Sequence, residues 1–430
     1  MNLELLSRPI GAAKKARARI AAHLRMRAFA SHGRRLFRDD PRYDLKNVSD
    51  GFASRIDDRN DDAEILERIC AAYRKAEEEE RMAPEQYQPP EPWQQIRRRN
   101  LGPVITALKE QDIPALRRMY RSFYRDACST GILGAPNGQP RAYFAPKIKD
   151  AYRHFYLSHV LYRLNYWKSI TGGKHLLRDL EGPGVGNPFG VVIDGTHICV
   201  GAEYAHYCSR RLDEELGTGS ATVAEIRAGF GGIAYYLLRD RPKTNYVDFD
   251  YPESIVLASY YLMKSFPKLR FLCYGEKAVT GESIRSADVV MLPFSELKRV
   301  PSKAMTLTFT SHGLAALRRE SVSRCLQDVG RMTAEKILLI GNRGAAELAS
   351  GAGNAASFPF ALHETRESGW HSYKVSGAGV GGAAGLRDAA VVEQSYIRIA
   401  APAQRAPGNS SPRTPSDKAL VLKWAPKVRR

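Results

Sequence analysis

The residues of this chain best suited to chemistry form a glycine-rich turn between an apolar run and an apolar helix start. Residues 223–234 read VAEIRAGFGGIA, so Glu225 closes the run and Gly229, Gly231 and Gly232 follow it. Glycines let the backbone approach a ligand closely, and the first turn of a helix presents unpaired N–H groups to that ligand. The pattern therefore predicts a strand, a turn and a helix that together hold a small molecule.

A second candidate residue, Asp250, closes the next apolar run, about 20 residues further along the chain. This run continues into a Tyr-Pro pair, reading VDFDYP over residues 247–252. A carboxylate at the end of the second strand can accept hydrogen bonds from both hydroxyls of an adenosine ribose, as it does in dinucleotide sites. Strand, turn, helix and acid together favour a nucleotide-type site over the alternative, a ligand-free turn of an α/β protein.

The elements that must position these residues follow from the hydrophobic pattern of the second half of the chain. Short β-branched runs predict strands at 223–226, 245–249, 270–273, 289–292, 305–309 and 336–340. Helical patterns lie between some of these runs, at 231–239, 252–265 and 313–332. Such alternation predicts an α/β fold with a Rossmann-like, doubly wound sheet, whose ligands bind at the carboxyl ends of the strands beside the switch point.

The first half of the chain has a different hydrophobic pattern, in which apolar residues recur every three or four positions. It predicts helices at 11–30, 60–83, 103–127 and 150–168, and then a short strand pair at 191–193 and 197–200. In the basic helix, Ile20, Leu24 and Phe29 lie near one face. The expected organisation is a basic arm or helix at 1–38, a mostly helical region at 39–210, a Rossmann-like domain at 211–400 and a basic disordered tail at 401–430.

The net charge of +19 is concentrated at the two ends of the chain. Residues 1–38 hold ten Lys or Arg against one acid, and residues 401–430 hold seven against one. The ends therefore supply 15 of the 19 charges, and the residues between them carry only +4. Basic tails of this kind bind polyanions such as nucleic acid, anionic lipid or acidic glycan, but a basic groove in the folded body is not indicated.

Composition also limits the compartment and the cofactor classes. The six cysteines contain no C-x-x-C pair, so neither a zinc site nor a dense disulfide framework is expected, and no metal is predicted. No run reaches the roughly 18 apolar residues of a spanning helix, and no secretory leader is evident. The expected localisation is cytoplasmic. A peripheral contact with the inner membrane surface and an organelle transit peptide remain alternatives.

Four motifs resemble those of the S-adenosylmethionine-dependent sugar O-methyltransferases of bacterial polysaccharide gene clusters. The segment Glu225–Gly232 is similar to that family's nucleotide motif, and Phe249–Glu253 to its second-strand motif of acid, apolar residue, Pro and Glu. Thr308–Leu314 resembles the motif of the fourth strand, and Val185–Gly190 the Gly-Asn-Pro lead-in. The resemblance covers about residues 85–400, and the first two motifs are the most specific.

This resemblance implies a methyltransferase that uses S-adenosylmethionine and methylates a hydroxyl of a sugar or polysaccharide precursor. The cofactor brings a good leaving group, so the protein mainly supplies alignment and a dry pocket. A hydroxyl nucleophile also needs a base, and His312, just past the fourth strand, is the candidate catalytic residue. The implied cofactor-binding residues are Glu225, Arg227, Gly229, Gly231, Gly232 and Asp250.

Two residues depart from the family pattern and keep other functions open. Arg227 stands where the first glycine is expected, and it can either clamp the methionine carboxylate or obstruct the cofactor. Ala316 stands where the family usually has Glu. Both departures also fit a catalytically degenerate binding protein. A nucleic-acid methyltransferase is a third alternative, although the basic charge lies in the tails and no Asn/Asp-Pro-Pro-Tyr/Phe motif occurs, so no specific nucleic-acid partner is expected.

Overall fold

The computed structural model describes residues 4–57, 61–133, 148–315, 317–342, 358–370 and 391–399. The chain divides into two units, Met1–Arg398 and Ile399–Arg430. Every helix and strand named below lies in the first unit. Ala316 and the basic tail expected at 401–430 lie outside the described residues.

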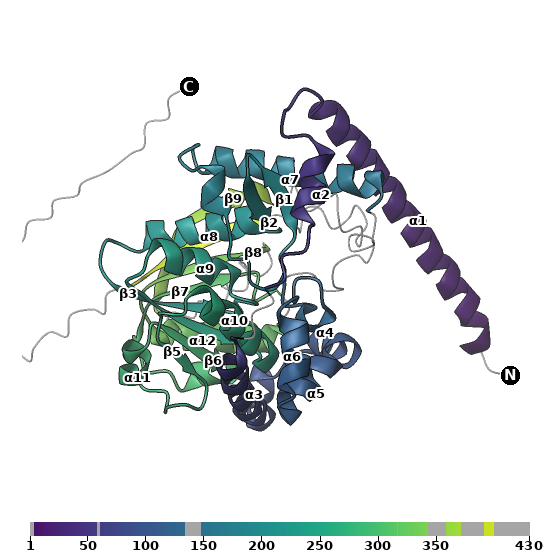
Figure 1. Ribbon diagram of the computed structural model, residues 1–430. Coiled ribbons are helices and arrows are strands. Elements are labelled where there is room, and N and C mark those ends of the chain that lie inside the picture. The colour runs from purple at the N-terminus through teal and green to yellow at the C-terminus, as the bar shows by residue number, and fades with distance from the viewer. Residues whose placement is uncertain are drawn as a thin grey trace, which may run out of the picture. The chain divides into compact units, whose positions relative to one another are not determined.

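The first part of the chain is mostly helical, as its hydrophobic pattern predicts (Figure 1). Its α-helices are α1 (Glu4–Leu36), α2 (Leu45–Gly51), α3 (Ala63–Met82), α4 (Glu91–Ile96), α5 (Gly102–Glu110), α6 (Ile113–Tyr120), α7 (Asp150–Ile170) and α8 (Ala202–Glu215). The shorter pieces are the 3-10 turns η1 (Glu85–Tyr87), η3 (Ala127–Ser129) and η5 (Leu177–Leu180), and the π-helical η2 (Arg97–Leu101). The predicted strand pair is the antiparallel hairpin β1 (Gly190–Ile193) and β2 (Thr196–Cys199).

The single helix predicted over 103–127 is wrong, because the chain turns at Gln111. The backbone of Gln111 is left-handed, with a φ of 58°, and α5 ends just before it. The Asp112 carboxylate then accepts a hydrogen bond of 2.9 Å from the Ala115 N–H and caps α6. Pro114, in the first turn of α6, has no N–H to continue the ladder of α5, so two helices form instead of one.

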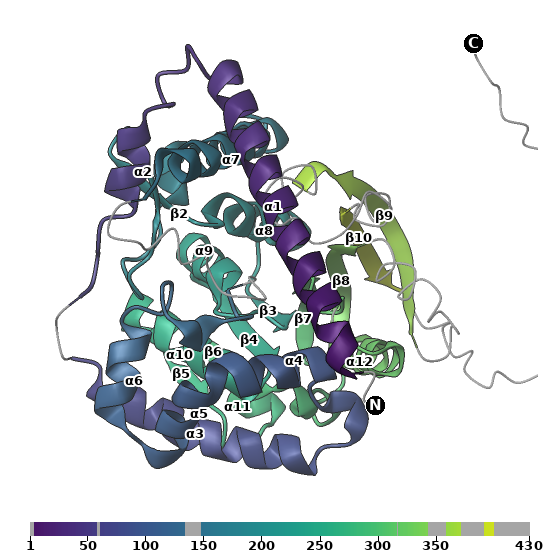
Figure 2. The same ribbon diagram turned by 90° about the vertical axis from the view of Figure 1, so that its right-hand side faces the viewer.

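The second part of the chain builds an eight-stranded sheet in the order β5-β6-β4-β3-β7-β8-β10-β9. Its strands are β3 (Ala221–Ile226), β4 (Thr244–Asp250), β5 (Phe271–Cys273), β6 (Val289–Pro293), β7 (Met305–Ser311), β8 (Thr333–Asn342), β9 (Phe360–Ser368) and β10 (Val391–Arg398). In this spatial order, the strands from β5 through β6, β4, β3 and β7 to β8 are all parallel. Strand β10 is antiparallel to both of its neighbours, β8 and β9, at one end of the sheet (Figure 2). The connecting helices are α9 (Gly232–Asp240), α10 (Pro252–Ser265), α11 (Gly281–Ser286) and α12 (Arg319–Met332). The predicted α/β, doubly wound, Rossmann-like fold is confirmed.

The point where strand order reverses lies between β3 and β7. From β3 the chain moves outward to β4 on one side, and it later returns to place β7 on the other side, with Glu225 opposite Phe309. The connections on the two sides leave in opposite directions, so a crevice forms beyond the carboxyl ends of these two strands. The glycine turn follows β3, and His312 follows β7, so the predicted site residues converge on this crevice.

The helix predicted at 313–332 begins later than expected, at Arg319. His312 has a left-handed backbone, with a φ of 61°, and its N–H donates to the Ile340 carbonyl at 2.7 Å. The residues that follow form a turn, in which the Ala315 N–H donates to the His312 carbonyl at 3.2 Å. Arg318 has an extended backbone, with a φ of −68° and a ψ of 155°, so α12 begins only at Arg319.

One apolar core joins the helical region to the sheet. The ring of Tyr120 lies 5.3 Å from that of Tyr260 on α10. The ring of Phe123 lies 6.0 Å from that of Phe230 in the glycine turn. These contacts hold the N-terminal helices directly against the elements that carry the predicted site.

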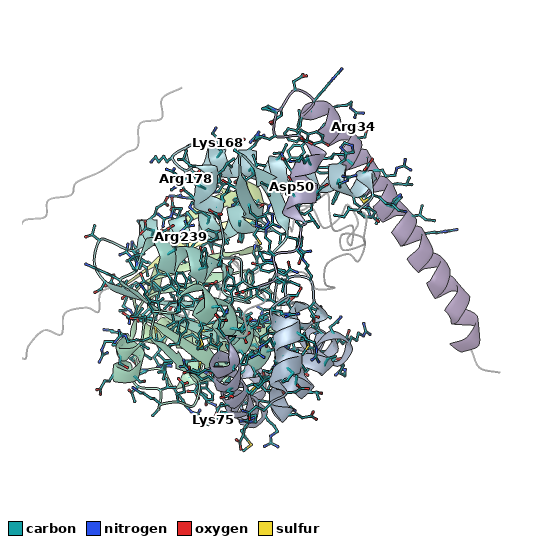
Figure 3. The ribbon with its side chains drawn as sticks, viewed as in Figure 1. Arg34, Asp50, Lys75, Lys168, Arg178 and Arg239 are labelled. Atoms are coloured by element: carbon teal, nitrogen blue, oxygen red, sulfur yellow. The ribbon has the colours of Figure 1, made fainter. Side chains whose placement is uncertain are left out.

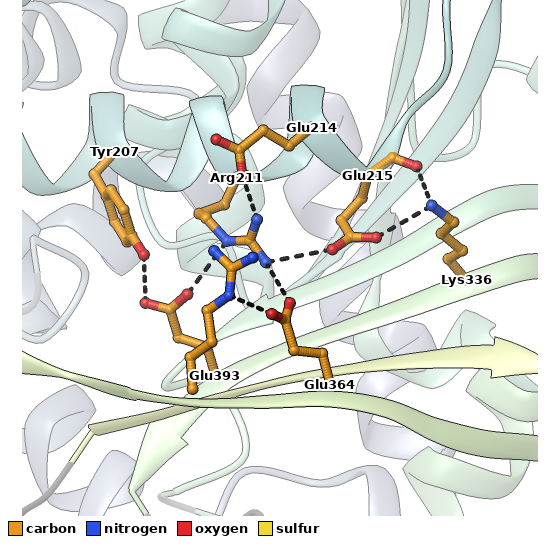
Figure 4. Close-up of polar contacts among 8 residues, drawn as sticks. Tyr207, Arg211, Glu214, Glu215, Lys336, Glu364 and Glu393 are labelled. Carbon is orange, nitrogen blue, oxygen red and sulfur yellow. Dashed lines mark hydrogen bonds and ion pairs between the residues drawn. The ribbon is translucent and has the colours of Figure 1, made fainter. Parts of the chain in front are cut away.

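A buried charge network ties α8 to the antiparallel strands (Figure 4). The Tyr207 hydroxyl donates to Glu393 on β10 at 2.7 Å, and Arg211 Nε donates to the same carboxylate at 3.3 Å. Lys336 on β8 donates to the Glu215 carbonyl at 2.8 Å. The network positions α8, whose first turn borders the crevice.

Helix α1 rests on α7 through its second half, where the rings of Phe29 and Phe155 lie 5.6 Å apart. Ile20 and Leu24, predicted to share a face with Phe29, are 61% and 59% exposed. In the described part of the chain, no helix contains the apolar stretch that crossing a bilayer requires. On the body of the first unit, cations such as Lys168 and Arg178 are exposed at scattered positions (Figure 3).

Candidate functional site

A cavity of about 540 Å³ lies at the carboxyl ends of β3 and β7. This volume falls within the roughly 300–1,000 Å³ typical of small-molecule sites. Five predicted site residues from the ends of the strands and the turns that follow them line the cavity: Arg227, Gly229, Gly232, Asp250 and His312. The helical region contributes side chains that the sequence did not single out, among them Trp93, Ile96, Tyr124, Ile132 and Tyr204.

The glycine turn has the left-handed backbone that its composition predicts. Gly229 and Gly231 have φ values of 69° and 85°, and Gly231 precedes the first residue of α9. A Cβ added to Gly229 would lie 2.6 Å from the Ile132 carbonyl oxygen, so only glycine fits there. Gly229 and Gly232 line the cavity, whereas Gly231 shapes the turn behind them and is not part of the lining.

Asp250 lies beside the glycine turn, as the sequence predicts. Its Oδ2 accepts a hydrogen bond from the Gly229 N–H at 3.0 Å, and its Oδ1 accepts one from the Tyr251 N–H at 2.7 Å. The residue is only 2% exposed, yet it borders the cavity. Burial raises the pKa of Asp250, while Arg227 and the two N–H groups oppose that rise.

Arg227 reaches across the turn toward the same acid. Its Nε lies 3.5 Å from Asp250 Oδ1, and its guanidinium lies 4.1 Å from the centre of the Tyr251 ring and 5.7 Å from that of Trp93. The side chain is 11% exposed. Nε and Nη1 have no hydrogen-bond partner among the residues that the structure describes. Arg227 is therefore a nearly buried cation in the cavity lining, and these two nitrogens are themselves buried.

Glu225 lies beneath the turn rather than in the cavity lining. It is 1% exposed, and its Oε2 accepts a hydrogen bond from the Tyr246 hydroxyl at 2.7 Å. Burial raises the pKa of Glu225 to about 7. Asp248, which the sequence analysis did not assign to the site, is opposite Glu225 on β4, and burial raises its pKa as well. Both acids support the turn from the core side.

The turn after β7 places His312 in the lining of the same cavity. A Cβ added to the next residue, Gly313, would lie 2.6 Å from the Ile226 carbonyl oxygen, so this turn packs closely against the end of β3. The His312 ring lies 6.1 Å from that of Tyr204 on α8. The hydroxyls of Tyr204 and Ser311 are 2.7 Å apart and share a hydrogen bond.

The helical region is fastened over the site by a buried ion pair. Arg97, in the π-helical η2, lies with its Nε 2.7 Å from Glu253 Oε1 and its Nη1 2.6 Å from Glu80 Oε2. Glu253 belongs to the second-strand motif, but no sequence pattern indicates Arg97 as its partner. This pairing holds η2 and the adjoining α4, with Trp93, against the end of β4.

No group of three or more His, Cys, Asp or Glu side chains that could hold a metal ion occurs within the described part of the chain. The groups in the cavity lining include a carboxylate, a guanidinium, backbone N–H groups and an imidazole. Together they can bind a molecule that has a diol at one end and an anionic group nearby, and the imidazole can accept a proton.

No protein-family model and no curated protein matches this chain. Three similar solved structures are a mitomycin 7-O-methyltransferase, a geranyl diphosphate C-methyltransferase from Streptomyces coelicolor and a TehB-like methyltransferase from Corynebacterium glutamicum. Their identities to this chain are 13%, 11% and 11%, and their TM-scores are 0.30, 0.34 and 0.29. The matches cover 46%, 47% and 56% of this chain and 55%, 81% and 100% of those chains. This chain thus spans about half the length of the mitomycin enzyme, and the likeness is one of fold alone.

Proposed function

We propose that this chain is an S-adenosylmethionine-dependent methyltransferase that methylates a hydroxyl group. One observation carries the proposal: the Gly229 N–H donates to Asp250 Oδ2 at 3.0 Å, at the edge of a 540 Å³ cavity. The hydrogen bond joins the turn that suits an adenosyl group to the acid that suits its ribose. The sequence resemblance implies a sugar or polysaccharide precursor as the acceptor, and the proposal itself extends only to a hydroxyl group.

The residues at this wall fit the cofactor. Each carboxylate oxygen has two acceptor positions, and each oxygen of Asp250 uses one for a backbone N–H. The remaining positions suit the two ribose hydroxyls. Arg227 also lines the cavity, and its guanidinium suits the carboxylate of the methionine part. When bound, S-adenosylmethionine supplies a methyl group on a sulfonium sulfur.

His312 is the proposed base for the acceptor hydroxyl. It borders the same cavity from the β7 side, where an acceptor can lie between it and the glycine turn. A base at this position takes the proton that the hydroxyl loses as it becomes a nucleophile. The walls contributed by the helical region keep water away and fix the orientation of the two reactants.

One observation favours a second candidate, a degenerate binding protein. Arg227 Nε lies 3.5 Å from Asp250 Oδ1. The carboxylate that is proposed to bind the ribose is therefore already paired with a cation. The Arg227→Gly substitution separates the two functions. A working site loses affinity for S-adenosylmethionine with this substitution, whereas an obstructed site gains it.

A structure with S-adenosylhomocysteine, the stable product of methyl transfer, tests the proposal. We expect the two ribose hydroxyls within hydrogen-bond distance of Asp250 and the homocysteine carboxylate beside Arg227. A product molecule bound outside this cavity, or bound in it with the ribose turned away from Asp250, would contradict the proposal.

A further inference from the structure

The part of the cavity lining that comes from the start of α8 and the end of β7 is mainly apolar. We call this the acceptor end and define it by six residues: Val200, Ala202, Tyr204, Ala205, Ser311 and His312. The first four come from the loop before α8 and from its first turn. Val200, Tyr204 and Ala205 are half-buried, so they offer apolar surface to a bound molecule.

The polar groups of the acceptor end are few and partly engaged. Ser311 and Tyr204 share the hydrogen bond between their hydroxyls. Burial raises the pKa of the Tyr204 phenol well above its ordinary value, so this side chain stays neutral. His312 carries the imidazole of this set, a group that can accept a proton from a reacting hydroxyl.

Aromatic side chains line another part of the cavity. The Tyr124 ring lies 5.5 Å from that of Phe230, which lies 5.2 Å from the ring of Tyr261. The hydroxyl of Tyr236 donates to the Leu180 carbonyl at 2.7 Å and is turned to the protein. These aromatic side chains present ring surface to the cavity.

A bare sugar matches this surface poorly, because it carries several hydroxyls and each one loses water on entering the cavity. A hydroxyl that is buried without a partner costs free energy, and so does an apolar wall that no ligand covers. A flat apolar ring with one hydroxyl meets both conditions: its ring covers Tyr204 and Ala205, and its hydroxyl reaches His312.

We infer that the acceptor is an apolar hydroxyl compound of the phenol type, rather than the bare sugar that the sequence resemblance implies. The inference rests on the proposed function for calling this ligand the acceptor. The binding preference of the acceptor end can be measured separately from cofactor binding.

Calorimetry of the full chain with 2-naphthol and with methyl α-glucopyranoside tests the inference, in parallel with a titration of S-adenosylmethionine. We expect 2-naphthol to bind at least about tenfold more tightly than the glycoside. Ala205→Asn places an amide at the acceptor end and should weaken 2-naphthol binding about tenfold, with S-adenosylmethionine binding unchanged. Ala71→Asn, at an exposed position of α3, is the matched control and should change neither affinity.

Three results would overturn the inference: tighter binding of the glycoside, equal binding of the two probes, or equal effects of Ala205→Asn and Ala71→Asn. Thermal unfolding of both variants identifies any loss of fold, and Ala205→Ser is the milder substitution for that case. If 2-naphthol binds as expected but S-adenosylmethionine does not, the apolar site stands and the proposed methyltransferase fails.

Discussion

Arg97 Nε lies 2.7 Å from Glu253 Oε1, so a residue of the helical region is paired with the acid that ends the second-strand motif. Both side chains are largely buried, at 15% and 2% exposed. The pair joins segments 156 residues apart, and it holds Trp93 near the site. Helix α4, which carries Trp93 and Ile96, is thus part of the binding cavity.

Removing Glu253 should destabilise the fold strongly. Glu253→Gln leaves the buried Arg97 guanidinium with Glu80 as its one charged partner, and the loss of a hydrogen bond to a charged group typically costs about 1.5–3 kcal/mol. Denaturant unfolding measures the change. Glu91→Gln breaks the exposed contact with Arg98 and is the control, with an expected change below about 1 kcal/mol. Equal losses in the two variants would show that the buried pair has no special role.

The buried Glu225 makes stability depend on pH. Its pKa is raised to about 7 by burial, so the folded state keeps a proton that the unfolded state loses near the ordinary value of 4.5. The stabilisation is present below about pH 4.5 and is lost as the pH rises through 7. Relative to Glu225→Gln, the natural chain should lose on the order of 3 kcal/mol between pH 4.5 and pH 8. A constant difference across this range, measured by denaturant unfolding, would contradict the assignment.

The glycine turn should tolerate no side chain at Gly229. Its φ is 69°, and a Cβ would lie 2.6 Å from the Ile132 carbonyl oxygen, which belongs to the backbone and cannot rotate away. Gly229→Ala should therefore cost about 1–3 kcal/mol of unfolding free energy and weaken cofactor binding. Gly184→Ala has open space around its Cβ and should be close to neutral. Thermal unfolding of both variants makes the comparison.

Substitution of His312 should separate chemistry from binding. His312→Gln removes the proposed base, and we expect methyl transfer to fall about 10²- to 10⁴-fold while S-adenosylmethionine affinity stays unchanged. His363→Gln, at an exposed position of β9, is the control and should keep full activity. Unchanged turnover in His312→Gln, measured by transfer of a labelled methyl group, would remove His312 from the mechanism.

Arg227 should recognise the carboxylate of the cofactor. A hydrogen bond to a charged group contributes about 1.5–3 kcal/mol, so Arg227→Gly should weaken S-adenosylmethionine binding about 10- to 100-fold. Decarboxylated S-adenosylmethionine lacks the proposed partner, and its affinity should change much less. The glycine also removes the strain of the φ of 63° at this position, so folding is expected to survive. Equal effects on the two ligands would exclude the contact.

The half of the site that belongs to the sheet could be predicted because its signals are local. Gly229 and Asp250 each follow a β-branched run, and parallel strands bring their carboxyl ends to one edge. The late start of α12 was missed, since the extended backbone of Arg318 follows a turn that packs against the end of β3 and leaves no periodic signal. The split at Gln111 has local signals in Asp112 and Pro114, but the apolar spacing that continues on both sides of them favoured a single helix.

The half of the site that belongs to the helical region could not be predicted from these patterns. Trp93, Tyr124 and Ile132 reach the cavity through contacts with residues far along the chain, and their spacing is that of ordinary core positions. The roles of Arg97 and Tyr204 likewise depend on how the helices pack on the sheet. Such tertiary contacts leave no periodic signal in a single sequence.

Calorimetric titration of the purified chain with S-adenosylmethionine, repeated on Asp250→Ala and on Asp288→Ala, tests the central proposal most directly. Asp288 lies at the start of β6 and pairs with Arg270, outside the cavity lining. We expect one cofactor per chain, a loss of about 100-fold in affinity for Asp250→Ala and no change for Asp288→Ala. Equal affinity in the natural chain and in Asp250→Ala would contradict the proposal.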